Sequence, residues 1–200
     1  MMRIGLMGPA DGDEAAFRDA AEFLLGDVSV DRVVYLGQDG VAARVAEAWA
    51  REVAGETGLS FEDRAAALAI DGSPEAIASL LRADLQARRI GSICTVPRGP
   101  ARAVEMVDDR IMLLVHDKSV LDEEDIANAS LVVYGQSKEL LLKRFGPRYF
   151  FTPGPLRAQK VGVIEREDDG RIAVAAFSPS GVPLFREVLA GKSVKLTVST

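Results

Sequence analysis

Polar side chains follow several short apolar runs of this sequence, at positions where strands would end. They are Asp11, Gln38, Asp39, His116, Gln136 and Lys138. Carboxylate and imidazole groups bind divalent metals or move protons, amides orient ligands, and a lysine ammonium repels a second cation. A set of this kind therefore predicts a polar site whose chemistry depends on how many imidazole and carboxylate groups it contains.

Two common catalytic motifs do not fit the sequence. A nucleophilic triad would use His116 with Ser137 or Ser119, but no Gly-x-Ser-x-Gly elbow accompanies either serine. The glycine-rich segments 5–12 and 37–40 lack the Gly-Lys-Ser/Thr ending of a phosphate-binding Walker loop. We interpret both segments as strand-to-helix turns.

The first half of the chain predicts strands that alternate with helices. Short apolar runs ended by Gly, Pro or Asp are typical of buried strands, and apolar residues at helical spacing predict the intervening helices. Ser73 and Pro74 fit the cap and first position of one of these helices. The expected strands are 3–7, 32–36 and 90–96, and the expected helices are 15–25, 41–53, 61–69 and 74–89.

The second half predicts mostly strands. A two-residue turn joins 104–107 to 110–115, and the Glu-Asp-Asp-Gly segment 167–170 predicts a second hairpin. Further strands are expected at 131–134, 149–151, 161–166, 172–177, 184–188 and 194–198, with a helix at 122–129. We therefore expect an α/β protein, a four-layer α/β/β/α sandwich of two mixed sheets, with residues 1–200 in a single domain.

Composition excludes several classes of function. A net charge of −6 and a pI near 5.0 disfavour nucleic acid as a partner. No apolar run approaches the roughly 20 residues that span a bilayer, so membrane insertion is not expected. Cys94 is the only cysteine, which rules out a disulfide within the chain and predicts a buried thiol. Without a signal-peptide pattern at the start, a cytoplasmic location is expected.

The order of the strand ends resembles the calcineurin-like metallophosphoesterases, in particular their small bacterial and archaeal phosphodiesterase branch. The matching segments are 2–7, 31–37, 96–102, 110–116, 131–135 and 151–155. In that family, strands ending in Asp-x-His, Gly-Asp, Gly-Asn, His-Gly and Gly-His-x-His hold two divalent metals. The metals activate water and bind the phosphoryl oxygens. The resemblance thus implies the family's fold and the position of its site.

The side chains at these strand ends depart from the family's pattern. Pro9-Ala10-Asp11 stands in place of Asp-x-His, Gln38 in place of the bridging aspartate, and Pro100 in place of the ligating asparagine. Gln136-Ser137-Lys138 replaces His-x-His, so His116 is the only histidine of the whole chain. Two metals need several imidazoles and carboxylates, and proline offers no side-chain ligand. We therefore expect a degenerate member with no bound metal, no cofactor and no catalytic residue.

A metal-free pocket rich in carboxylates would need another source of positive charge. One hypothesis is that Lys138 compensates Asp11 and Asp39 in a polar cluster. Gln38, Gln136 and His116 would complete it. The alternative is that Lys138 and Asp39 point into solvent. His116 itself is expected to be a hydrogen-bonded residue at a strand end.

Three functions follow as hypotheses. The first is a protein-binding or scaffolding module, a role for which the retromer complex, with its metallophosphoesterase-like subunit, is a precedent. The binding surfaces of this chain would be 140–142 with Phe145, and 149–151. The alternative is that these apolar residues belong to the core. The partner would be a protein, and a homodimer is compatible. The second is a phosphodiesterase with one metal held by Asp11, Asp13, Asp39, His116 and Asp117. The third is a sensor of a phosphorylated small molecule that uses Arg98, Arg102, Lys138 and the helix after Gly12.

Overall fold

Two mixed β-sheets make up the centre of the structure, a computed structural model that describes residues 2–55 and 59–190. The six-stranded sheet has the order β11 (Pro183–Val188), β10 (Ile172–Phe177), β9 (Val161–Arg166), β1 (Arg3–Met7), β2 (Arg32–Tyr35) and β3 (Ile93–Thr95). The five-stranded sheet has the order β4 (Ala103–Val107), β5 (Arg110–Val115), β6 (Leu131–Tyr134), β8 (Arg148–Thr152) and β7 (Leu141–Phe145). Strand β1 runs parallel to β2 and antiparallel to β9, and β5 runs parallel to β6 and antiparallel to β4.

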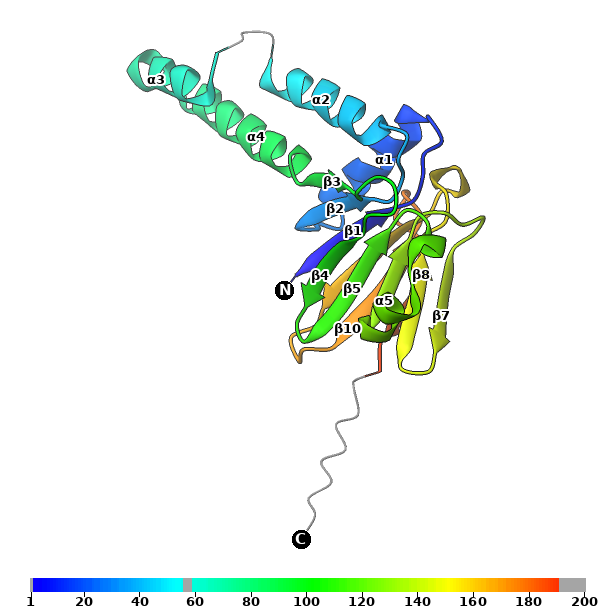
Figure 1. Ribbon diagram of the computed structural model, residues 1–200. Helices are drawn as coiled ribbons and strands as arrows, with labels where there is room; N and C mark the ends of the chain where they lie inside the picture. The colour runs from blue at the N-terminus through cyan, green and yellow to red at the C-terminus, as the bar shows by residue number, and fades with distance from the viewer. Residues whose placement is uncertain (1, 56–58, 191–200) are drawn as a thin grey trace.

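Helices cover the outer faces of both sheets. Helices α1 (Glu14–Leu25) and α2 (Val41–Ala54) pack on the six-stranded sheet, and α5 (Glu123–Asn128) flanks the five-stranded one. Helices α3 (Phe61–Asp71) and α4 (Pro74–Ile90) form a hairpin that projects away from the sheets (Figure 1). The predicted α/β sandwich of two mixed sheets between helices is confirmed. Two short 3₁₀ helices, Lys118–Val120 and Leu156–Ala158, complete the described elements.

Side chains that alternate along the strands build the layers. Ile4 and Leu6 of β1 face the five-stranded sheet, whereas Met7 faces the helices on the outside. In the opposite sheet, Leu114 faces the central core and Leu113 belongs to the cluster near α5. This period of two, with both faces apolar, explains why these strands appear in the sequence as nearly continuous apolar runs.

Three details differ from the sequence predictions. Strand β7 was not predicted, because its Leu-Leu-Lys-Arg-Phe sequence lacks a regular alternation and lies at a sheet edge with mostly exposed side chains. Strand β3 is shorter than 90–96, since Ile90 still belongs to α4. The prediction of a buried Cys94 is wrong: β3 is an edge strand and leaves this thiol exposed. The predicted strand 194–198 lies outside the described residues.

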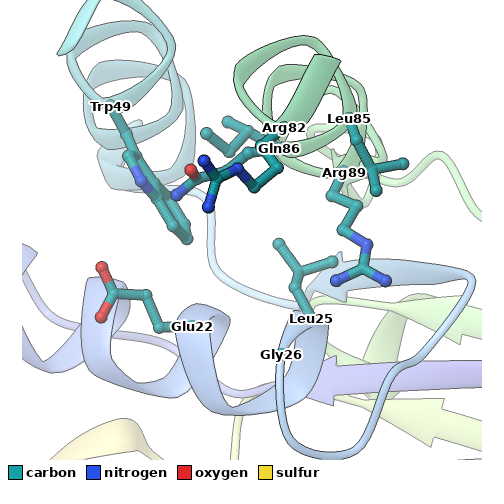
Figure 2. Close-up of a pocket in the computed structure, with 9 residues that line it drawn as sticks. Glu22, Leu25, Gly26, Trp49, Arg82, Leu85, Gln86 and Arg89 are labelled. Carbon is teal, nitrogen blue, oxygen red and sulfur yellow. The ribbon is translucent and has the colours of Figure 1, made fainter. Parts of the chain in front are cut away.

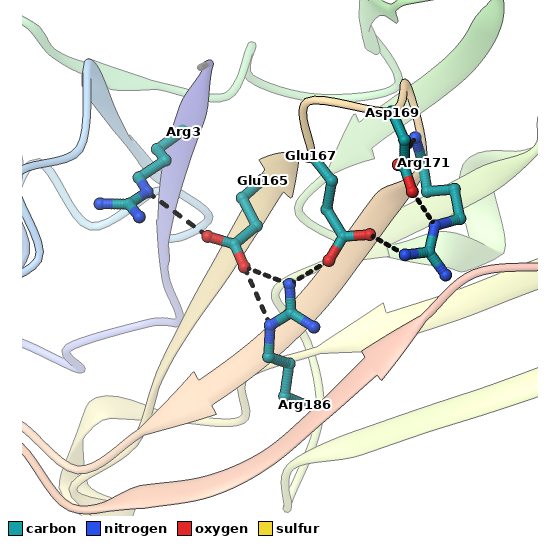
Figure 3. A network of polar contacts seen from close by, with 6 residues as sticks. All are labelled: Arg3, Glu165, Glu167, Asp169, Arg171 and Arg186. Carbon is teal, nitrogen blue, oxygen red and sulfur yellow. Dashed lines mark hydrogen bonds and ion pairs between the residues drawn. The ribbon is translucent and has the colours of Figure 1, made fainter.

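Alternating charges connect β1, β9 and β11 on one face of the six-stranded sheet. Arg186 of β11 donates to Glu165 and Glu167, and Arg171 pairs with Glu167 and Asp169 (Figure 3). Arg3 of β1 lies 3.4 Å from the same Glu165 carboxylate. Individual exposed ion pairs contribute about 0–1 kcal/mol, so this network mainly specifies register at the sheet edge.

The carboxyl ends of strands from both sheets approach one another without side chains between them. A Cβ atom added to Gly8, just after β1, would lie 1.7 Å from the carbonyl oxygen of Gly154, which follows β8. A Cβ on Gly135, just after β6, would lie 2.3 Å from the carbonyl oxygen of Leu36. Glycine is therefore required at these two positions by the close contact of two backbones.

We predict that Gly8→Ala lowers the free energy of unfolding by about 1–3 kcal/mol or more, because the added methyl group overpacks a backbone contact. Denaturant unfolding of the purified chain measures this change. Gly91→Ala is the control: Gly91 ends α4 with φ −62° and its nearest Cβ contact would be 3.3 Å. An equal loss of stability in both variants would contradict the proposed contact.

Candidate functional site

A pocket of about 300 Å³ lies where these strand ends meet. It is lined by Pro9, Asp11, His116, Gln136, Ser137, Pro155 and Arg157. The segments after β1, β5, β6 and β8 supply these residues. Half of the positions singled out from the sequence thus line one pocket: Pro9, Asp11, His116 and Gln136. The other half, Gln38, Asp39, Pro100 and Lys138, do not line it.

Asp39 is held in a network of hydrogen bonds beside this pocket. Its carboxylate accepts from the Tyr35 hydroxyl at 2.9 Å, the Gly12 N–H at 3.0 Å and the Val41 N–H at 3.1 Å. The Tyr35 hydroxyl in turn accepts from the buried Ala10 N–H at 2.8 Å. These contacts connect the loop after β1 with the loop after β2. The carboxylate therefore acts as a structural acceptor here.

The same contacts determine the ionisation of both side chains. Partial burial alone would raise the pKa of Asp39, but the hydrogen bonds from Val41, Tyr35 and Gly12 outweigh it and hold the pKa below its ordinary value of 3.8. Burial raises the pKa of the Tyr35 hydroxyl, and its hydrogen bond to Asp39 contributes to the rise. The pair is therefore a neutral phenol that donates to a carboxylate over the physiological pH range.

Arg157 supplies the positive charge of the pocket. Its guanidinium lies 3.1 Å from the Asp11 carboxylate, and both side chains remain more than half exposed, at 70% and 56%. The sequence did not indicate Arg157 as a site residue, because 146 positions separate it from Asp11. The segment 151–155, which resembles the family's last loop, was the one signal that this part of the chain returns to the site.

His116 is a hydrogen-bonded residue at a strand end. Its Nδ1 lies 2.7 Å from the Leu36 carbonyl oxygen, which links the end of β5 to the end of β2 across the two sheets. A carbonyl can only accept, so Nδ1 carries the proton in this hydrogen bond. The backbone N–H of Gln136 donates to the His116 carbonyl at 2.7 Å. The interpretation of His116 as a strand-end hydrogen-bonding residue is confirmed.

The predicted cluster around Lys138 does not form. Lys138 is exposed and makes no ion pair with Asp11 or Asp39 within the described residues. Gln38 donates instead to the Pro97 carbonyl oxygen at 2.9 Å, and Pro100 is exposed. The reason is that Tyr35, backbone N–H groups and Arg157 already provide the donors that the two carboxylates need.

The other candidate ligands have local structural partners. Asp13 caps α1, and Asp117 caps the short 3₁₀ helix through the Ser119 N–H. Arg102, predicted to bind an anion, pairs with Asp125 of α5 at 2.6 Å. Each of these residues serves its own stretch of chain or a neighbouring element.

These residues do not fit a two-metal centre. In the described ranges, no three His, Cys, Asp or Glu side chains come together as possible ligands. The pocket contains one imidazole, from His116, and one carboxylate, from Asp11, which is already paired with Arg157. Its two prolines have no side-chain atom that could bind a metal. We therefore derive no reaction step through a metal.

Comparison with solved structures identifies the fold. A conserved protein of Streptococcus pneumoniae, classed by prediction as a phosphoesterase, has a TM-score of 0.53 and 15% identity over 94% of this chain and 96% of that one. An archaeal phosphodiesterase has a TM-score of 0.52 and 16% identity over 94% of this chain and 100% of that one. Vacuolar protein sorting 29 from Cryptosporidium parvum has a TM-score of 0.53 and 12% identity over 95% and 98%. The chain has the calcineurin-like metallophosphoesterase fold.

The likeness to metallophosphoesterases is one of structure alone. No family model and no curated protein sequence matches the chain. At identities of 12–16%, the fold is shared while the site has to be judged from its own residues. Within the described residues, no helix has both the length and the apolar character to cross a membrane.

We predict that Tyr35→Phe lowers the free energy of unfolding by about 1–3 kcal/mol, because the buried Ala10 N–H loses its acceptor and Asp39 loses a donor. Chemical denaturation measures the change. Tyr134→Phe is the matched control, since this buried tyrosine makes no side-chain hydrogen bond within the described residues and should change stability by less than about 0.5 kcal/mol. Equal losses would show that the hydroxyl network is not responsible.

A second prediction concerns pH. Because folding lowers the pKa of Asp39, its ionised form stabilises the fold above the unfolded value, near 4, and this contribution is lost as pH falls through the lower folded value. Melting temperatures should therefore drop as the pH falls below about 5, and Asp39→Asn should reduce that drop. A wild-type pH profile retained in full by Asp39→Asn would refute this assignment.

Proposed function

We propose that this chain is a non-catalytic protein-binding module built on the metallophosphoesterase fold. One observation carries the proposal: three polar side chains at the strand ends, Asp39, Asp11 and His116, are already bound to other groups of the protein. Asp39 accepts three hydrogen bonds, Asp11 pairs with Arg157, and His116 bonds to Leu36. Catalytic groups need free lone pairs aimed at a substrate. Because these groups mainly join loops of the protein to one another, the site supports a role in protein binding rather than in catalysis.

The open edge of the sandwich between β7 and β11 is the best candidate surface. Leu141 and Phe145 of β7 are 36% and 52% exposed, and Leu184 of β11 is 42% exposed. A groove of about 370 Å³ lies between these strands, lined by Leu140, Leu141, Leu142, Phe185, Arg186 and Glu187. The predicted surface 140–142 with Phe145 therefore includes exposed side chains. The other predicted surface does not, since Tyr149 and Phe151 are core residues.

Edge strands with exposed apolar side chains favour a peptide or loop as the occupant. Both β7 and β11 lie at the end of their sheet order, so each has one side without a neighbouring strand. Such edges can add a strand of a partner through backbone hydrogen bonds, while side-chain grooves provide specificity. We propose an extended segment of a partner protein between β7 and β11.

One observation favours an alternative. The strand-end pocket is lined by His116, whose Nε2 makes no hydrogen bond within the described residues, and by the exposed guanidinium of Arg157. A single weakly held metal or a phosphorylated small molecule could use these groups. Since a structural neighbour is an archaeal phosphodiesterase, residual phosphodiester hydrolysis is the competing proposal to test.

The test compares two variants of the full-length chain. Phe145→Asp should lose a stoichiometric partner that co-purifies from the native host, because Phe145 is an exposed apolar side chain of β7 and a charge there is unfavourable in an apolar contact. Met106→Asp is the matched control, since Met106 is 58% exposed on β4 at the other edge of the same sheet. If both variants retain the partner, the β7–β11 surface is wrong.

An activity assay tests the non-catalytic part of the proposal. We expect no hydrolysis of an aryl phosphodiester by the purified chain with Mn²⁺ added. Mn²⁺-dependent turnover that disappears in Asp11→Ala would overturn the proposal and establish the alternative.

A further inference from the structure

A pocket of about 430 Å³ lies between α4 and the body of the molecule, and it shares no lining residue with the strand-end pocket. Figure 2 shows that its side chains come from three helices: Leu25 ends α1, Trp49 belongs to α2, and Arg89 belongs to the last turn of α4. Pockets of about 300–1,000 Å³ commonly bind small organic molecules when an apolar wall is combined with a few convergent polar groups. Both features are present here.

The apolar wall consists mainly of side chains that the core holds in place. Leu25, Trp49 and Ile90 are only 4%, 4% and 2% exposed. Leu85, which is 54% exposed, extends the wall toward solvent. The wall is therefore fixed at its base and open at its rim, and an apolar group that enters the pocket would cover Leu85.

The polar groups of the pocket lie mostly on one side of α4. Arg82, Gln86 and Arg89 follow one another at intervals of four and three residues, so their side chains lie along the same side of the helix. That side faces α2 and the end of α1 (Figure 2). Two guanidinium groups and one amide thus border the same space as the apolar wall.

The positive charges of the pocket are not matched by carboxylates of the protein. Neither Arg82 nor Arg89 makes an ion pair within the described residues, and Arg82 Nε donates only to the Ala78 carbonyl oxygen, at 3.3 Å. Glu22 is the carboxylate that lines this pocket in the described part of the chain, and Arg18 already binds it at 2.9 Å. An anionic group of a ligand would therefore meet two guanidinium groups that are free to bind it.

We propose that this pocket binds a small amphipathic anion, an apolar body that carries one carboxylate or phosphate group. The body lies against Leu85 and the buried wall, and the anionic group accepts hydrogen bonds from Arg82 and Arg89, with Gln86 as a further donor. A neutral ligand would leave both guanidinium groups without a partner, and a cationic ligand would be repelled. Because the pocket is separate from the β7–β11 groove, this ligand-binding role is additional to the protein-binding role proposed above.

Titration of the full-length chain with octanoate tests the proposal, and Trp49 reports the location because it is the only tryptophan of the chain. Calorimetry should show saturable binding of one octanoate per chain, with a parallel change in Trp49 fluorescence. Neutral 1-octanol should bind at least about tenfold more weakly, because it gains no ion pair. The proposal is overturned by a lack of saturable binding at millimolar octanoate, by binding that leaves Trp49 fluorescence unchanged, or by equal binding of octanol.

Replacement of single arginines tests the contacts to the anionic group. Arg89→Gln and Arg82→Gln should each weaken octanoate binding about tenfold and leave octanol binding unchanged. Arg88→Gln is the matched control, since Arg88 is the neighbouring arginine of the same helix but pairs with Asp84 at 2.8 Å and does not line the pocket. An effect of Arg88→Gln as large as that of Arg89→Gln would contradict the site, because it would reflect the general charge of α4.

Two further comparisons test the apolar body and the type of anionic group. Leu85→Asp should abolish octanoate binding with an unchanged melting temperature, because Leu85 is exposed. Tighter binding of octanoate than of octyl phosphate would assign the anionic group to a carboxylate, and the reverse order would assign it to a phosphate ester. Full octanoate binding by Leu85→Asp refutes the role of the apolar wall, as does equal affinity for inorganic phosphate and octyl phosphate. No residue of this pocket lies on the β7–β11 groove, so these results are independent of the Phe145→Asp experiment.

Discussion

The Tyr35 hydroxyl lies at the contact on which the geometry of the strand ends depends. It accepts from the buried Ala10 N–H and donates to Asp39, which in turn accepts from Gly12 and Val41. Its ring is buried and packs edge-on against Phe17 of α1, with centroids 5.0 Å apart. Since an unpaired buried donor is costly, this set of bonds fixes the loops after β1 and β2 in one arrangement. The pocket forms between loops held in this way.

This arrangement joins the strand ends through the protein's own groups. In a two-metal site, cations would bring strand ends together by coordination. In this protein the strand ends are joined by hydrogen bonds that involve a phenol, backbone N–H groups, an imidazole and a guanidinium. The carbonyl oxygen of Leu36 makes two of these contacts, because it lies against Gly135 and accepts a hydrogen bond from His116. The end of β2 therefore contacts the ends of both β5 and β6. The groups are polar, but they are directed at one another.

The structure separates its internal polar contacts from its exposed apolar surfaces. The strand-end pocket is small, and Asp11 and His116 in it have protein partners, whereas exposed apolar side chains include those of the β7–β11 edge and of α4. These two surfaces belong to different elements, the sheet edges and the projecting hairpin (Figure 1).

Local patterns in the sequence determined the elements and the fold class. The apolar runs at 3–7 and 131–134, and the Ser73–Pro74 start of α4, depend on neighbours within a few residues, and the described elements follow them. The sequence alone also shows that Pro9 and Pro100 offer no side-chain ligand atom and that Gln38 carries no charge, because these properties depend only on residue type.

Only the tertiary structure decided which polar groups meet. Arg157 reaches Asp11 across 146 positions, and Tyr35 engages Asp39 because its ring is buried against α1. Exposure was equally undetermined: Cys94, Leu81 and Leu85 have apolar side chains that a sequence pattern can assign to a core, yet an edge strand and a projecting hairpin leave them exposed. The physical reason is that periodicity shows which residues share a face, while only packing shows what covers that face.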